Sequence, residues 1–280
     1  MHPIGLAALA LAICASGAAH ADEPSPADVK PLWEFGLGAG VLAFDDYRGS
    51  ATSHAYPIPL PYFVYRGNFL RSDANGLRGR FFNQDRVELS FSVNGTTPVL
   101  NDSARHGMPD LRPTLEVGPA LDIHLWRSAD ERLKLNVRVP VREAFTIDTS
   151  PRAIGAFAAP NINLDIAQLR GSEGWKLGFL AGPLFAIRSY DDYFYSVAPQ
   201  YASPGRPAFE ARGGYAGTQA LASLSRRYPS YWVGAYVRYD TLAGASFADS
   251  PLVATHGYWT LGFGVAWMIA KSTRLVESKE

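Results

Sequence analysis

Apolar residues occupy every second position over long stretches of this chain, and small, polar or charged residues fill the positions between them. The clearest stretch runs from Tyr258 to Ile269. One parity of this stretch is large and apolar: Trp259, Leu261, Phe263, Val265, Trp267 and Ile269. The other parity is mostly small: Tyr258, Thr260, Gly262, Gly264, Ala266 and Met268. Because successive side chains of a β-strand point to opposite faces, the pattern predicts a strand with one apolar face and one small or polar face.

The same alternation predicts about twelve strands, many of them long enough to cross a bilayer at a tilt. The predicted strands are residues 33–43, 56–66, 69–73, 77–82, 86–94, 114–126, 132–145, 153–166, 175–188, 218–226, 231–240 and 258–269. The region between residues 56 and 82 is the least regular, because prolines and arginines interrupt it, and its register stays open.

The links between these strands mostly alternate in length, although residues 74–76 form a short outer link. Short inner turns are predicted at residues 67–68, 83–85, 127–131, 167–174 and 227–230, and long outer loops at 44–55, 95–113, 189–217 and 241–257. Outer-membrane barrels have short periplasmic turns and longer outer loops. We therefore predict an all-β protein, a transmembrane antiparallel up-and-down β-barrel of the outer-membrane type. The alternative is a secreted β-sandwich or lipocalin-like barrel, whose strands are usually shorter.

Aromatic residues on the apolar parity gather near the predicted strand ends. Tyr and Trp favour the boundary between lipid and water, because the ring is apolar and its polar atom is hydrated. We expect an interfacial belt of Trp33, Trp175, Tyr231, Tyr239, Trp259 and Trp267. Trp126 lies at a rim position but on the wrong parity, so a β-bulge or a misplaced strand end is expected there.

The two ends of the chain flank the barrel. Residues 1–21 have the apolar run and small-residue site of a secretory signal peptide, with cleavage after Ala21. A polar lead-in (22–31), the barrel (32–269) and a short periplasmic tail (270–280) follow. Cys14 is the only cysteine, so the mature chain has no disulfide and depends on its closed sheet. The 26 basic residues balance the 26 acidic ones, which gives no basic excess for nucleic acid.

Charged residues fall on the parity opposite the apolar one, as expected of positions that avoid lipid. The candidates for the inner wall are Glu34, Arg86, Glu88, Glu116, Asp122, Lys134, Arg138, Arg142 and Arg238. Mixed signs along this wall indicate either ion pairs that brace the barrel or a hydrated pore of weak preference. The pattern alone favours bracing and leaves the pore open.

No motif specifies an enzyme, a cofactor or a metal. Gly36-x-Gly38-x-Gly40 lacks the spacing and the following helix of a dinucleotide loop. The Asp45-Asp46 and Asp191-Asp192 pairs, and Asp249 with His256, provide no spaced nucleophile, base and orienting group. The mature histidines are scattered, without a metal-ligand pair. We expect no catalytic residue, no cofactor and no metal site.

Several segments, in order along most of the mature chain, resemble the MipA/OmpV family of outer-membrane proteins. They are Tyr47-Arg48-Gly49-Ser50, Tyr56-Pro57-Ile58-Pro59, Leu115-Glu116-Val117-Gly118-Pro119, Asp192-Tyr193-Phe194-Tyr195-Ser196-Val197, Arg206-Pro207-Ala208-Phe209, Gly213-Gly214-Tyr215-Ala216-Gly217 and Phe247-Ala248-Asp249-Ser250-Pro251-Leu252. One departure is the C-terminus, since such barrels usually end on an aromatic residue. Here Gly264-x-x-Trp267-x-Ile269 resembles an internal version of that signal, and residues 270–280 follow it.

The resemblance implies a Gram-negative outer-membrane barrel without enzymatic activity. The family's founding member is named as a scaffold between a lytic murein transglycosylase and a peptidoglycan synthase. The expected partners are outer-membrane lipid and lipopolysaccharide, with a murein hydrolase or synthase on the periplasmic side and no nucleic acid. Two alternatives stay open: a diffusion channel for small solutes, suggested by the charged wall, and a surface adhesin or stress-response protein acting through the long loops.

Overall fold

An antiparallel sheet makes up nearly all of the protein. The computed structural model describes residues 29–66, 70–73, 76–79, 82–84, 86–100, 102–169 and 172–277. The predicted signal peptide and its cleavage site at Ala21 lie outside these residues, as does most of the lead-in. No helix in the described part of the chain is long and apolar enough to cross a membrane.

The elements follow one another as strands with one short helix and two 3-10 turns. They are β1 (Val29–Pro31), β2 (Trp33–Asp45), β3 (Ser53–Arg66), β4 (Leu70–Asp73), β5 (Gly76–Gly79), β6 (Phe82–Gln84), β7 (Val87–Thr96), η1 (Ser103–Arg105), β8 (Thr114–Arg127), β9 (Leu133–Thr146), β10 (Ala153–Ala158), β11 (Asn161–Leu169), β12 (Ser172–Ala186), α1 (Arg188–Tyr195), η2 (Pro199–Tyr201), β13 (Gly214–Arg227), β14 (Tyr231–Thr241), β15 (Gly257–Lys271) and β16 (Leu275–Glu277).

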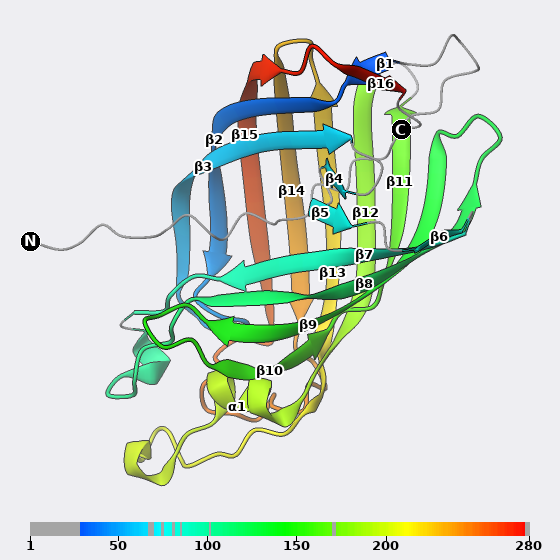
Figure 1. Ribbon diagram of the computed structural model, residues 1–280. Helices are drawn as coiled ribbons and strands as arrows, with labels where there is room; N and C mark the ends of the chain where they lie inside the picture. Colours follow the sequence, from blue (N-terminus) through cyan, green and yellow to red (C-terminus); the bar gives the residue numbers. More distant parts are fainter. Residues whose placement is uncertain are drawn as a thin grey trace, which may run out of the picture.

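The main sheet has 14 strands, in the order β5-β4-β3-β2-β15-β14-β13-β12-β10-β9-β8-β7-β6, with β11 also pairing β12 and β9. β2, the first long strand, pairs with β15, the last, so the sheet curls round on itself (Figure 1). β5 and β6 end the hydrogen-bonded order, and β5 contacts β7. The up-and-down antiparallel barrel predicted from the sequence is confirmed.

The strand count differs from the prediction in two places. The predicted strand 153–166 is divided into β10 and β11, which share one position between β9 and β12. Pro160 lies at the break, where its missing N–H removes a hydrogen-bond donor. β6 begins at Phe82, the last residue of the predicted strand 77–82, and continues into the predicted turn 83–85, where it pairs with the start of β7.

The exposed face of the strands is the one formed by their large apolar residues, as a membrane requires. Leu37 is 50% exposed and Phe263 is 56% exposed, whereas Glu116 is 2% exposed. A soluble barrel would bury the large apolar side chains and expose the carboxylate. Here the apolar side chains cover the outside, where lipid replaces water, and the polar side chains line the inside. This arrangement excludes the soluble sandwich or lipocalin-like alternative.

A β-bulge explains the wrong parity of Trp126. The pairing of β8 with β9 shifts between His124 and Trp126, where one extra residue of β8 enters the ladder. Leu125 and Trp126 are consequently both exposed. The expected irregularity at this rim is confirmed.

The described segments on either side of the barrel meet beyond the inner ends of β2 and β15. β1 and β16 form a separate two-stranded ribbon, with Lys30 opposite Val276. The backbone N–H of Leu32 donates to the carbonyl of Arg274 at 2.8 Å, and that of Ser272 donates to the carbonyl of Trp33 at 2.8 Å. Figure 1 shows β1 and β16 side by side at the end opposite α1. Part of the predicted lead-in and part of the predicted tail therefore form one ordered element.

Candidate functional site: the outer cap and the charged inner wall

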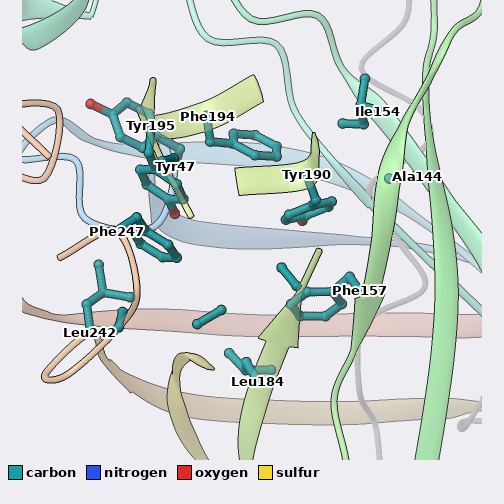
Figure 2. Close-up of a cluster of buried hydrophobic side chains, with 14 of the residues drawn as sticks. Tyr47, Ala144, Ile154, Phe157, Leu184, Tyr190, Phe194, Tyr195, Leu242 and Phe247 are labelled. Carbon is teal, nitrogen blue, oxygen red and sulfur yellow. The ribbon is translucent and has the colours of Figure 1, made fainter. Parts of the chain in front are cut away.

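The long outer loops pack against one another instead of extending into solvent. We call the described residues of 46–52, 97–113, 187–213 and 242–256 the outer cap. Its apolar core is the principal buried cluster, which also includes residues from the outer ends of the strands (Figure 2). The rings of Tyr195 and Phe247 stack with their centroids 3.7 Å apart, and Tyr190 stacks on Phe157 of β10 at 5.4 Å. The cap is thus attached to the barrel wall through a continuous aromatic core.

Hydrogen bonds to β8 and to two outer loops hold helix α1 at the mouth of the barrel. The Tyr190 hydroxyl donates to Glu116 Oε1 on β8 at 2.8 Å, and the Tyr195 hydroxyl donates to the carbonyl of Arg48 at 3.0 Å. Arg105 Nη1 donates to the carbonyl of Phe194 at 2.9 Å. Burial raises the pKa of Tyr190 and Tyr195 well above the usual tyrosine range, so both hydroxyls stay protonated donors.

Arg48 joins the cap to the inner wall. Its Nε donates to the Tyr258 hydroxyl at 3.0 Å and lies 3.5 Å from Asp240 Oδ1, while Nη1 donates to the carbonyl of Ala216 at 2.7 Å. Asp240 also receives Arg238 Nε at 2.7 Å. A buried carboxylate shared by two guanidinium groups is stabilised only because its oxygens are bonded. The sequence placed Arg238 on the inner wall but did not relate it to Arg48, because Arg48 lies in a loop near the other end of the sequence.

Asp191 of α1 is a buried carboxyl group inside the cap, with 1% of its surface exposed. Neither of its oxygens makes a hydrogen bond within the described part of the chain. Burial raises its pKa to about 7, and the Arg48 guanidinium opposes part of that rise. A carboxylate in a predicted outer loop is usually solvated, but Asp191 is not, because the loop folds inward. Asp192 remains on the outer side, where it accepts from the Ser196 hydroxyl.

Along β8 and β9 the inner charges form pairs of opposite sign. Arg142 Nε lies 3.3 Å from Glu116 Oε2, and Arg138 Nε lies 3.5 Å from Asp122 Oδ1. Further bonds come from β7, where the Asn94 amide donates to Glu116 and the Ser92 hydroxyl accepts from Arg142. These contacts favour ion pairs that brace the wall over a row of unpaired charges lining a pore.

The remaining inner-wall candidates are placed less uniformly. Glu34 is buried and forms an ion pair with Arg227, which reaches it from β13 and also lies over the Tyr62 ring. Glu88 is buried in β7, and Lys134 is half-buried in β9. Arg86 does not belong to the wall, because it lies in the turn before β7 and is exposed. The sequence missed Arg227, since it was assigned to a turn.

The aromatic residues expected at the membrane interfaces lie at the strand ends. Trp33 and Tyr231 are the first residues of β2 and β14, and Tyr231 pairs with Trp267 across the ladder. Trp175 lies near the start of β12, with Arg226 over its ring at 5.8 Å. At the outer end the rings of Tyr239 and Trp259 lie 4.8 Å apart on the outside. These positions are the ones that an interfacial belt requires.

Metal-ligating side chains do not gather in the described residues. No group of three or more histidine, cysteine, aspartate or glutamate side chains could hold a metal ion there. Four of the buried carboxylates lie against arginines: Glu34, Glu116, Asp122 and Asp240. The arrangement supports anchoring of the cap and rigidity of the wall.

Solved structures with a similar strand arrangement are outer-membrane proteins. One described as a bacterial polysaccharide outer membrane secretin is 11% identical, with 87% of this chain and 100% of that chain covered and a TM-score of 0.41. The toluene transporter TodX of Pseudomonas putida is 12% identical, with 87% and 68% covered and a TM-score of 0.29. Outer membrane phospholipase A from Escherichia coli is 12% identical, with 88% and 94% covered and a TM-score of 0.29.

Scores this low carry no argument about activity, so the barrel assignment depends on the register and the exposure pattern described above. No curated protein matches the chain. The profile of one protein family, described as MltA-interacting protein MipA, matches residues 37–269, which run from within β2 to within β15. This chain is therefore an outer-membrane β-barrel protein and belongs to the MipA family.

Proposed function

We propose that this protein is a non-enzymatic scaffold that binds a murein-remodelling enzyme at the periplasmic end of its barrel. The description of the family names an interaction with MltA, which gives the class of partner. Short turns lie at that end of the barrel and offer little surface. The single observation that supports a docking point there is the β1–β16 ribbon, which joins the segments that precede and follow the barrel.

The ribbon has properties suited to recruiting a protein. A two-stranded ribbon has two edges, and an extended segment of a partner can add to such an edge by main-chain hydrogen bonding. Leu275 on β16 is 57% exposed and provides an apolar contact beside that edge. The residues linking the ribbon to the barrel are hydrogen-bonded, so the docking point has a defined position relative to the membrane.

Photo-crosslinking in intact envelopes tests this proposal. A photoreactive residue at position 275 should capture a murein hydrolase or synthase, while the same residue at position 259, at the outer end, should not. Leu275→Asp should reduce capture from a crosslinker at position 30 without changing barrel folding. Equal capture from positions 275 and 259, or capture of general lipoproteins alone, would count against the scaffold.

The contacts of the inner wall and the cap favour the scaffold over a diffusion channel. The charged side chains of β8 and β9 are paired, and the outer cap packs as a core. Purified folded protein in a planar bilayer should therefore show no stepwise conductance. Regular conductance steps altered by Arg138→Glu would instead support the channel.

A further inference from the structure

Arg226 is a cation on the lipid-facing side of the barrel. Side chains along β13 alternate as the wall requires, with Leu221 4% exposed inside and Leu224 36% exposed outside, so position 226 shares the outward side of Leu224. Across the ladders Arg226 pairs with Trp175 of β12 and with Val233 of β14, in the adjacent strands that Figure 1 shows side by side. Because Trp175 belongs to the aromatic belt at the periplasmic end, Arg226 lies at the level of that membrane boundary.

Two aromatic rings hold the guanidinium group of Arg226. Its Cζ atom lies 4.7 Å from the centroid of the Tyr228 ring and 5.8 Å from that of the Trp175 ring, and both distances are within the range of a cation–π interaction. The Tyr228 ring in turn stacks on Tyr231, with the centroids 4.4 Å apart and the ring planes at 16°. These contacts position the cation without using its hydrogen-bond donors.

The side chain of Arg226 is directed toward the periplasmic end of the wall. A Cβ atom on Gly174 would lie 3.4 Å from Arg226 Nε and 3.9 Å from its Cζ, and Gly174 is one residue closer to that end than Trp175. Tyr228, which follows the last residue of β13, lies closer to the guanidinium than Trp175 does. Arginine on a lipid-facing surface extends in this way, so that its alkyl stem stays in hydrocarbon while its charge reaches the headgroups.

The donors of this guanidinium group are available to a ligand. Arg227, the next residue, points inward and forms an ion pair with Glu34, whereas Arg226 has no hydrogen bond or ion pair within the described part of the chain. In the same part of the chain the hydroxyl groups of Tyr228 and Tyr231 also make no hydrogen bond. A guanidinium group is a planar fork of N–H donors that matches two oxygens of one phosphate. At the boundary of a bilayer, the phosphate of a lipid headgroup is the acceptor within its reach.

We propose that Arg226, with Trp175, Tyr228 and Tyr231, binds the phosphate group of a membrane phospholipid in the periplasmic leaflet. The guanidinium donates to two phosphate oxygens, and the two tyrosine hydroxyls supply further donors. The acyl chains of the same lipid lie along the apolar outward side chains nearer the middle of the wall, among them Leu224. This site is separate from the β1–β16 ribbon and does not depend on the scaffold function.

Native mass spectrometry of the full protein, refolded in a non-ionic detergent and titrated with phosphatidylglycerol, tests the proposal. The native protein should retain the lipid with an apparent Kd at least about tenfold lower than that of Arg226→Gln, because the variant lacks the charged hydrogen bonds to phosphate. Arg274→Gln is the matched control, since Arg274 is exposed at the same end of the barrel, between β15 and β16, and its replacement removes the same charge. The affinity of this control should equal that of the native protein.

A diacylglycerol with the same acyl chains lacks the phosphate and should bind at least about tenfold more weakly than phosphatidylglycerol. Equal affinities of Arg226→Gln and Arg274→Gln for phosphatidylglycerol would overturn the proposal. Displacement of the lipid by millimolar inorganic phosphate would also overturn it, because the site would then bind a free anion. Unchanged lipid binding in Arg226→Gln, together with loss of crosslinking from position 275, would assign Arg226 to a protein partner instead. If Arg226→Gln fails to fold, Arg226→Leu, which suits the apolar outward side, is judged by the same criteria.

Discussion

The stability of the outer cap should depend on pH through the buried carboxyl group of Asp191, and replacing that group should abolish the dependence. This carboxyl group is enclosed by α1 and the cap, and its pKa rises from 3.8 in an exposed carboxyl to about 7 in the folded state. The folded cap then holds a proton that the opened cap releases. Its stability is therefore greatest in acid, decreases as the pH rises through the interval between these two values, and stays constant above it.

The size of the effect follows from the shift. Each pKa unit corresponds to 1.36 kcal/mol, so the full shift is worth about 4 kcal/mol, of which about 3 kcal/mol falls between about pH 5 and about pH 8. Asparagine has the shape of a protonated aspartate and cannot ionise. The Asp191→Asn protein should therefore keep at high pH the stability that the native cap has in acid.

Hydrogen exchange of the α1 amides, residues 188–195, measures opening of the cap once intrinsic exchange rates are corrected for pH. In the native protein the protection factors should fall roughly 100-fold from about pH 5 to about pH 8, and in Asp191→Asn they should stay level. Asp192→Asn is the control, because that side chain is 39% exposed and should leave the native pH dependence intact. Equal falls in the native and Asp191→Asn proteins would refute the reasoning.

Other predictions concern the wall and the outer surface. Glu116→Gln leaves the buried Arg142 charge without its partner and should lower the free energy of unfolding by about 3–5 kcal/mol in urea titrations. Glu210→Gln, in an exposed pair with Arg188, should change it by less than about 1 kcal/mol; similar losses in both would contradict the assignment. Phe263→Arg places a cation on the lipid-facing side and should cost about 2–4 kcal/mol, whereas an unchanged urea midpoint would argue against lipid contact. Gly38→Val should prevent formation of the heat-modifiable folded band on gels, because a Cβ there would lie 1.9 Å from the carbonyl oxygen of Val265.

Much of the barrel could be predicted because its signal is local. The alternation in segments such as 258–269 specifies both the strand and the side that meets lipid, and the structure exposes Phe263 and buries Ala266 accordingly. The irregular places could not be predicted in the same way. Pro57, Pro59 and Pro61 read as interruptions of a strand, although they belong to β3, which pairs with β2 without a break from Ser53 to Tyr65.

The conformation of the outer loops could not be predicted from their sequence either. Arg48, Asp191 and Tyr258 have no spacing that relates them, and loop carboxylates such as Asp191 are usually solvated. Folding brings Arg48 to Tyr258 across 210 positions of the chain and encloses Asp191 beneath the cap. Contacts of that separation depend on which strand ends become neighbours, which a period of two residues does not encode.

The amino-acid sequence by itself determined the class of protein, the direction in which each strand presents its apolar side, and the family. The reason is that hydrocarbon outside the sheet imposes the same alternation on every strand. Only the tertiary structure decided that the outer loops close into an aromatic cap and that Arg227 pairs with Glu34. Both depend on side chains that become neighbours only when the barrel curls, so no local pattern records them.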